Sequence, residues 1–287
     1  MKNIKYFFQF IFIIFLFFIF KIVGLKFSSF LSGNIFKLLG PMIRPNKIVF
    51  ENLKRAFPNI NENEKKIILK KMWFNYGTIL AEYIFLKNFR NKKNYYKKII
   101  IENTDILKKI KSDTNPVIFI SGHFSNFELM AMQIEKLGVD LAAVYRPLNN
   151  KFLNPIMEKI RKNYICKKQI KKGISGTKEL LQNFKDGTSI ALMIDQRVSQ
   201  GIKSKFFGTD ALTTTIPAQF VKKFSAKIVP VYIERLKDYQ FKIKFYDPLK
   251  FTEDESIETI TLKLNQILEN MIIQNPEQWI WTHDRWK

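Results

Sequence analysis

The sequence predicts an α/β fold, with a mixed, mostly parallel sheet flanked by helices and an N-terminal membrane anchor helix ahead of it. Short runs rich in β-branched and aromatic residues recur between residues 116 and 245, and helical stretches separate them. Residues 7–20 read FFQFIFIIFLFFIF and contain one polar residue, Gln9. The first pattern predicts the sheet and its covering helices, and the second predicts the anchor.

The anchor has a marginal length for crossing a membrane. Beyond Lys21 the apolar character resumes through Ile22, Val23 and Leu25, so the run reaches the roughly 18 residues that a span needs only if Lys21 snorkels. A cleaved signal peptide is the alternative, because lysines precede the apolar run, but no small-residue cleavage site follows it. We therefore expect an uncleaved anchor, either a short span or an interfacial helix. More positive charges follow the run than precede it, which places the body of the protein in the cytoplasm.

The rest of the chain divides into a connector and one folded unit. Residues 27–45 mix apolar residues, glycines and positive charge, as a membrane-lying connector would, so we predict domains at 1–45 and 46–287. Apolar residues recur at helical spacing over 46–86, and Pro58 and Asn61 mark a turn and a helix start. A last helix is expected at 257–273. Strands are expected at 116–120, 141–145, 189–194, 227–233 and 241–245, with an antiparallel edge.

Composition limits the classes of partner. The chain has 287 residues and a formal net charge of +23. The excess of Lys, beside many Ile, Asn and Phe, is partly what an AT-biased coding sequence produces. What remains favours an anionic partner, which is nucleic acid, an acidic carrier protein or an anionic membrane surface. A single Cys excludes an internal disulfide framework, and without a CxxC pair or a His-rich cluster we expect no metal site.

The most informative segment is PVIFISGHFSNFELMAMQIEKLG, residues 116–138, where a predicted strand turns into a helix. The chain has two histidines, and an imidazole is the simplest base near neutral pH. His123 stands five positions before Glu128. Two residues five apart do not share a helix face, so the pair can meet only if His123 lies in the turn and Glu128 in the first turns of the helix. Taken alone, the pair is better explained as a surface histidine beside a helix with an ordinary first-turn Glu.

A family resemblance accompanies this segment. GHFSNFE resembles the H-x4-D/E motif of glycerolipid and lipid A acyltransferases, and VYRPLNN resembles the Y-R-P segment of the late lipid A acyltransferases. Arg161 matches that family's second arginine, and MIDQR, KFFG, TTT and IVPVYIER resemble its downstream segments. FENLKRAFPNI and the C-terminal NPEQWIWTHDRWK match the two ends of its pattern. The likeness covers about residues 46–287 in the same chain order, which makes it specific.

The resemblance implies a glycerolipid-acyltransferase-like fold and an O-acyltransferase of lipid A and lipopolysaccharide biosynthesis. The expected reaction moves a fatty acyl chain from an acyl thioester, such as acyl-acyl carrier protein, to a hydroxyl of a lipid A precursor. His123 is then the general base, and Glu128 is expected to hold the other ring nitrogen as its orienting acid. No cofactor beyond the thioester co-substrate is expected. The expected location is the bacterial inner membrane, with the catalytic domain on the cytoplasmic side.

Four further residues are predicted to bind substrate. Arginine binds phosphate or carboxylate through two points where lysine cannot, and Arg146 and Arg161 lie in the matched segments, so we expect them to contact the acceptor phosphate or the site loops. Surface ion pairs are the alternative. Asp195 and Gln196 end an apolar strand, where ligands sit in open α/β sheets. We expect both to shape the site without transferring a proton, with a strand-capping turn as the alternative.

The remaining conspicuous residues have simpler predicted roles. His283 and its neighbouring tryptophans are expected to pack, at a membrane interface or as a lid over an acyl chain. The runs of lysine are expected to be solvated faces that also attract an acidic acyl carrier protein or anionic lipid. Cys166 is expected to be a buried, unreactive thiol.

Other functions compete with this reading. Net charge alone suggests a nucleic-acid-binding protein, but no known nucleic-acid motif is present and the anchor argues against it. A non-catalytic membrane scaffold of the same shape is a second alternative, against which the intact His123/Glu128 pair stands. Within the enzymes, the acceptor could instead be a lysophospholipid, glycerol phosphate or another membrane lipid. The Y-R-P and C-terminal segments favour lipid A.

Overall fold

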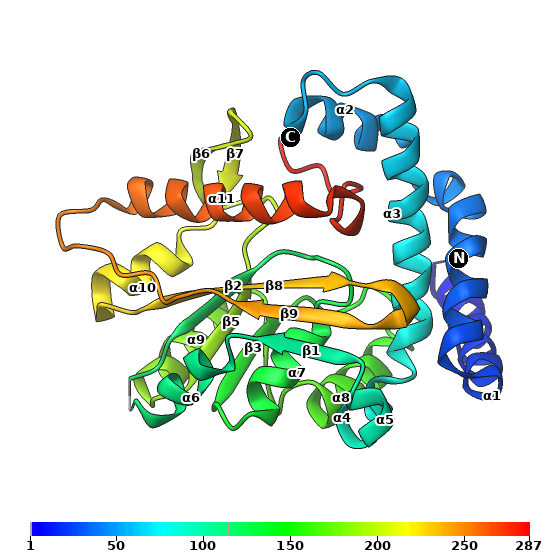
Figure 1. Cartoon of the computed structure of the whole chain (residues 1–287), viewed down its shortest axis with the longest axis horizontal. Coiled ribbons are helices and arrows are strands. Elements are labelled where there is room, and N and C mark those ends of the chain that lie inside the picture. The colour runs from blue at the N-terminus through cyan, green and yellow to red at the C-terminus, as the bar shows by residue number, and fades with distance from the viewer. Residues whose placement is uncertain (1, 114) are drawn as a thin grey trace.

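The computed structural model describes residues 2–113 and 115–287, and it confirms the predicted α/β class. A seven-stranded sheet in the order β1-β9-β8-β2-β5-β3-β4 forms the centre. Strands β8, β2, β5, β3 and β4 run parallel to one another. Strand β9 pairs with β8 in the antiparallel direction, and β1 pairs in parallel with β9. Helices flank this sheet (Figure 1). The bounds of the sheet strands are β1 Ile99–Glu102, β2 Ile118–Ser121, β3 Leu141–Tyr145, β4 Lys168–Lys171, β5 Ser189–Met193, β8 Ile228–Arg235 and β9 Phe241–Phe245.

The five strands expected from sequence are all present, within two residues at each end. The apolar runs of β2, β3, β5 and β8 suit strands that are covered on both faces, whereas β9 reads FKIKF and buries every second residue. Strands β1 and β4 were not predicted, because IIIE and KQIK are short and lie at the two edges of the sheet, where one side of each is unpaired.

A separate hairpin, also not predicted, is formed by β6 Ile202–Phe206 and β7 Thr209–Thr213. Its two-residue turn is Phe207-Gly208, and both residues have positive φ, 49° and 72°. Positive φ at both central positions is the requirement of the tight hairpin turn that matches strand twist.

The helices follow the predicted periodicity. Asn61 caps α3 as expected: its side chain accepts a hydrogen bond from Glu64 N–H, and the Glu64 side chain accepts one from Asn61 N–H. The helix bounds are α1 Lys2–Ile43, α2 Asn46–Ala56, α3 Glu62–Tyr83, α4 Leu86–Asn91, α5 Lys93–Tyr96, α6 Thr104–Ser112, α7 Glu128–Lys136, α8 Asn154–Tyr164, α9 Ile174–Lys185, α10 Ile216–Phe224 and α11 Ile257–Gln274, with 3-10 turns η1 Lys237–Tyr239 and η2 Pro276–Gln278.

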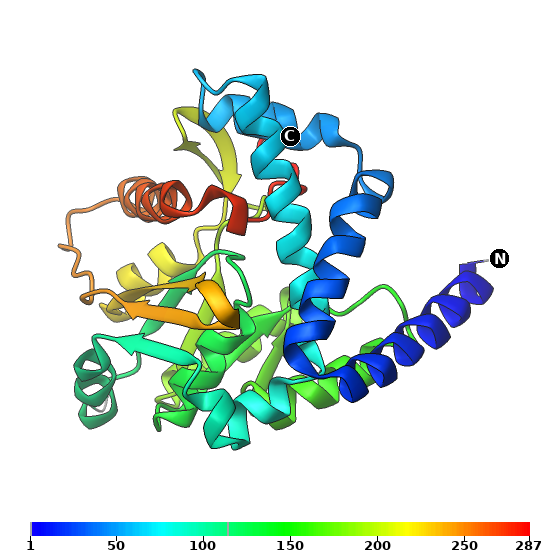
Figure 2. The same ribbon diagram turned by 45° about the vertical axis from the view of Figure 1, so that its right-hand side comes forward.

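Helix α1 is the one described helix long and apolar enough to span a membrane, with a mean hydropathy of 2.6 over its most apolar 18 residues. It bends at Gly24, whose φ of 81° and ψ of 169° are non-helical and suit only glycine. The bend separates an arm, residues 2–23, from an inner segment, residues 25–43 (Figure 2). The predicted connector is therefore helical.

The two parts of α1 meet the body differently. The inner segment packs along α3, and the approach is so close that a Cβ on Gly77 would lie 2.2 Å from the Ser32 carbonyl oxygen. The arm reaches away, but its Phe7 and Phe10 rings lie 5.6 Å and 6.1 Å from the Phe152 ring, in the loop after β3. Asn150 Nδ2 also donates to the Tyr6 carbonyl at 2.8 Å.

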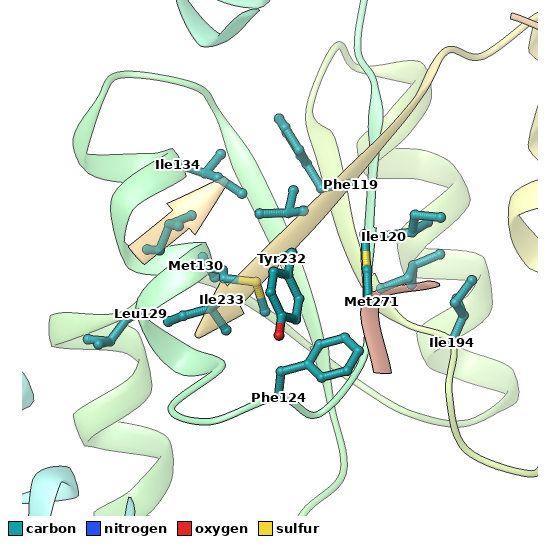
Figure 3. Close-up of a cluster of buried hydrophobic side chains, with 14 of the residues drawn as sticks. Phe119, Ile120, Phe124, Leu129, Met130, Ile134, Ile194, Tyr232, Ile233 and Met271 are labelled. Carbon is teal, nitrogen blue, oxygen red and sulfur yellow. The ribbon is translucent and has the colours of Figure 1, made fainter. Parts of the chain in front are cut away.

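Below the carboxyl ends of β2, β5 and β8 lies an apolar core built from the sheet, α7 and α11. Figure 3 shows Phe119, Ile120, Ile194 and Ile233 among its members. Phe124 leaves the strand edge and packs its ring on Tyr232, with centroids 5.1 Å apart. The loop that carries His123 is therefore seated on a fully buried apolar core.

Candidate active site

His123 lies in a loop, residues 122–127, which joins β2 to α7 and is called the histidine loop below. Parallel strands end at one edge of a sheet, so the end of β2 lies beside the end of β5. His123 follows the first strand and Asp195 follows the second. The loop needs a tight path, since Ser125 has a φ of 42° and a Cβ on Gly122 would lie 3.2 Å from Asp195 Oδ2 and closer still to Phe124.

Asp195 holds His123 at two points. Its Oδ1 lies 2.8 Å from His123 Nδ1, and its Oδ2 accepts the His123 backbone N–H at 2.8 Å. Oδ2 also accepts the indole N–H of Trp279 at 2.8 Å. The carboxylate is fully buried, whereas the imidazole is 21% exposed. Asp195 thus fixes both the loop and the ring, and Nε2 has no hydrogen-bond partner among the described residues.

The acid partner of His123 differs from the sequence prediction. Glu128 was expected to hold the second ring nitrogen, but that position belongs to Asp195. The reason is geometric: Glu128 begins α7 and directs its Oε1 to the Tyr83 hydroxyl at 2.5 Å and to Arg161 Nε at 3.0 Å. Asp195 was expected to shape the site without transferring a proton, and the same contacts add that it is the acid that holds the His123 ring.

The contact between His123 and Asp195 shifts the pKa values of both side chains. Burial lowers the pKa of His123, but Asp195 and, to a lesser degree, Glu128 outweigh it, so the pKa lies above its usual value. Burial raises the pKa of Asp195, yet the charge of protonated His123, together with the hydrogen bonds from His123 and Trp279, brings it below its usual value. The pair therefore consists of an ionised carboxylate and an imidazole of increased basicity.

The other predicted residues are placed as follows. Arg161, on α8, joins the site through Glu128; its Nη2 lies 2.9 Å from Oε1, and its Nη1 is buried without a partner among the described residues. Arg146 is exposed just beyond β3, and no salt bridge engages it within the described chain. Gln196 is half-buried beside Asp195 and makes no side-chain hydrogen bond there. No group of three or more His, Cys, Asp or Glu within residues 2–113 and 115–287 is placed to hold a metal ion.

Behind the histidine loop lies a buried ion pair. Glu82 of α3 has no exposed side-chain surface and pairs with Arg235 at the end of β8, where Arg235 Nη2 lies 3.0 Å from Glu82 Oε2. Asn126 Nδ2 donates to the same oxygen at 3.0 Å. Burial raises the pKa of Glu82, and the two partners offset that only in part. The pair thus ties the loop to α3 and the sheet.

The comparisons with known proteins identify a family. The family model for bacterial lipid A biosynthesis acyltransferases matches residues 1–287. The chain belongs to this family. It is 24% identical over 259 residues to the lipid A biosynthesis palmitoleoyltransferase of Escherichia coli strain K12, covering 87% of this chain and 82% of the relative. It is 23% identical over 258 residues to the lauroyltransferase of the same strain, covering 86% and 80%.

A third relative is the lipid A biosynthesis acyltransferase 2 of Shigella flexneri, 22% identical over 236 residues and covering 80% of this chain and 74% of the relative. Membership makes the chain an acyltransferase of lipid A biosynthesis. The palmitoleoyl and lauroyl relatives have nearly equal identity to it, so overall identity does not distinguish between these acyl groups.

Sequence reasoning missed several residues of this candidate site. Trp279 was expected at a membrane interface or in a lid, but it is fully buried and donates to Asp195. His283 Nε2 accepts the Arg197 backbone N–H at 2.9 Å and so holds the segment after Asp195, in agreement with a packing role. Tyr83 and Glu82 carry no motif of their own. The one sequence feature that pointed to any of these residues was the NPEQWIW segment, which contains Trp279. The match to the family indicated that the segment matters but not which residue it contacts.

Proposed function

We propose that this chain transfers a fatty acyl chain from an acyl thioester to a hydroxyl of a lipid A precursor, with His123 as general base. The observation that carries the proposal is the contact of His123 Nδ1 with the buried Asp195 carboxylate. This contact favours the tautomer with its proton on Nδ1, which leaves the Nε2 lone pair free to accept a proton.

The proposed chemistry needs no group beyond these side chains and the thioester. Nε2 takes the proton of the acceptor hydroxyl while the oxygen attacks the thioester carbonyl, and the C–S bond breaks as the tetrahedral intermediate collapses. The imidazolium then returns its proton to the thiolate leaving group. Asp195 stabilises the imidazolium at 2.8 Å.

Glu128 has a different proposed role from the one that its spacing suggested. With Tyr83 it fixes the Arg161 guanidinium, whose Nη1 has no protein partner among the described residues. We propose that Nη1 binds a phosphate or carbonyl oxygen of a substrate, so that Glu128 positions Arg161.

The proposed donor is an acyl-acyl carrier protein. Arg146 and Lys172 are exposed near the site, and neither forms a salt bridge within the described chain. Lys172 lies near enough to His123 to lower its pKa slightly. These cations suit an acidic carrier protein or a phosphate. If docking is electrostatic, raising the ionic strength will increase KM for the carrier-bound donor more than it lowers kcat.

We further propose that the protein lies at the inner membrane with this site on the cytoplasmic side. The arm supplies the apolar anchor, and the positive charges that follow it favour that orientation.

The decisive experiment measures acyl transfer to purified lipid A precursor by mass spectrometry. His123→Ala is expected to lower the rate by about 10²- to 10⁴-fold, the usual contribution of a general base, with an unchanged melting temperature. The other histidine supplies the control, since His283→Gln keeps an acceptor for the Arg197 N–H. Full activity of His123→Ala with loss in His283→Gln would reverse the assignment. Lysophospholipid and glycerol phosphate, tested as acceptors in the same assay, separate the alternative functions.

A further inference from the structure

We infer that a pocket behind the histidine loop binds one phospholipid with an anionic headgroup. The α1–α3 pocket has a volume of about 380 Å³, within the range of small-ligand sites. It lies between the inner segment of α1, α3 and η2, and residues that line it include Lys37, Ile67, Lys70, Lys71, Phe74 and Asn75. None of these belongs to the His123 site.

The positive charge of the residues that line the pocket favours an anionic ligand. Lys37 comes from α1, whereas Lys70 and Lys71 come from α3. Lys71 is partly compensated by Glu277, with Nζ 3.6 Å from Oε1. Lys37 and Lys70 have no salt-bridge partner within residues 2–113 and 115–287. Arg235, also in the lining, is neutralised by Glu82. At least two positive charges therefore converge on the pocket without a compensating carboxylate.

A buried polar group specifies an acceptor atom in the occupant. Asn75 is 5% exposed and lines the pocket. Its Oδ1 accepts from Arg235 Nε at 3.4 Å and Nη2 at 3.3 Å. Its Nδ2 has no hydrogen-bond partner in the described parts of the chain. An unpaired buried donor is unfavourable, and a phosphate or ester oxygen would satisfy it. A pure hydrocarbon would not.

The apolar part of the pocket favours a lipid over a soluble phosphate. Ile67 and Phe74 line it, and Ile67 is 53% exposed. On α1, the neighbours of Lys37 include Leu38, which is 75% exposed and belongs to the outward apolar surface of the anchor helix. An acyl chain can cover Ile67 and Phe74 and continue onto that surface, while the lysines extend toward the headgroup.

The pocket abuts the histidine loop from behind. Gln278 lines it, and its carbonyl accepts the Ser125 backbone N–H at 2.9 Å. Arg235 reaches Asn126 through Glu82. Gln278 and Arg235 thus lie between the bound phospholipid and the histidine loop. The phospholipid therefore occupies a different site from the proposed acyl acceptor.

The test uses the full chain in detergent, probed with phosphatidylglycerol and phosphatidylcholine, and counts retained lipid by native mass spectrometry. The wild type is expected to retain one phosphatidylglycerol in preference to phosphatidylcholine. Lys37→Ser/Lys70→Ser/Lys71→Ser is expected to bind it about 100-fold more weakly, because each lysine contributes about fivefold and Lys71 contributes less than that through its pairing with Glu277. Lys92→Ser/Lys93→Ser/Lys97→Ser removes the same charge from an exposed surface elsewhere and is expected to bind normally.

A second variant guards against misfolding. Asn75→Asp keeps the acceptor for Arg235 but replaces the free donor with a negative charge, so it is expected to lose phosphatidylglycerol while circular dichroism of the same sample shows a retained fold. Equal loss in the two lysine triple variants, or equal retention of the two lipids, would overturn the inference. So would competition by soluble glycerophosphoglycerol at the same concentration as the lipid, which would make the ligand a free phosphate ester. Acyl transfer is not measured, so failure here is distinct from failure of the proposed reaction.

Discussion

At the scale of single residues, the site depends on one buried carboxylate that accepts hydrogen bonds from three donors. Asp195 accepts from the His123 ring, the His123 backbone and the Trp279 indole. Each donor stabilises the ionised form, which explains why a carboxylate without exposed surface remains ionised. The imidazole in turn becomes more basic than a free histidine.

This coupling predicts a pH dependence. A base with a raised pKa is protonated and inactive below that pKa, so kcat/KM is expected to fall as the pH falls through a value above 6.5. Asp195→Asn removes the negative charge and leaves burial, which lowers the pKa of His123. The acid limb of the profile should move to lower pH while the maximal rate drops by up to about 10⁴-fold.

The measurement is the pH profile of kcat/KM for wild type and Asp195→Asn, with Glu128→Gln beside them. Glu128 is a smaller contributor to the His123 pKa, so its variant should shift the acid limb less. A larger shift in Glu128→Gln than in Asp195→Asn would return the orienting role to Glu128.

At the scale of elements, α3 connects the anchor to the chemistry. One face packs on the inner segment of α1, Tyr83 at its last turn holds Glu128, and Glu82 holds the histidine loop through Asn126. The Glu82–Arg235 pair joins this helix to β8 in a buried environment. Removing one member of such a pair leaves an uncompensated charge.

Arg235→Met is therefore expected to destabilise the protein by about 3–5 kcal/mol. Glu82→Leu/Arg235→Met, which removes both charges, should recover a large part of that loss, because two apolar side chains replace the pair. Unfolding monitored by circular dichroism in detergent gives both values. A double variant no more stable than Arg235→Met would show that the pair does not act as a unit.

At the scale of the whole molecule, the exposed apolar surface is concentrated on α1. Phe8, Phe12, Phe15 and Phe18 of the arm are 57–66% exposed, which is unusual for a water-facing helix and typical of one that meets lipid. The contacts of Phe7 and Phe10 with Phe152 keep this surface next to the loop that carries Arg146.

Changing these four phenylalanines to Ser is expected to weaken liposome binding of the purified protein by about 10⁴-fold, since each buried Phe contributes at least about 1.5 kcal/mol. Flotation with liposomes measures it. Ile100→Ser/Ile174→Ser/Ile273→Ser is the control, because these apolar residues are also exposed but lie outside α1. Release of the control to the same extent would contradict a dedicated membrane surface on the arm.

The sequence by itself determined much of this protein. Strand runs such as 141–145 and 241–245, the Asn61 cap, the anchor and the position of His123 after a strand are local features, set by periodicity and side-chain chemistry within a few residues. Edge strands β1 and β4 and the β6/β7 hairpin carry too short a pattern to be predicted in this way.

Only the tertiary structure decided which acid serves His123. Glu128 is five residues away but is turned toward Tyr83 and Arg161 by α7, whereas Asp195 is 72 residues away and arrives because β2 and β5 pair in parallel. Trp279 comes from the other end of the chain. Hydrogen bonds depend on distance in space, and strand pairing, which no local pattern encodes, brings these groups together.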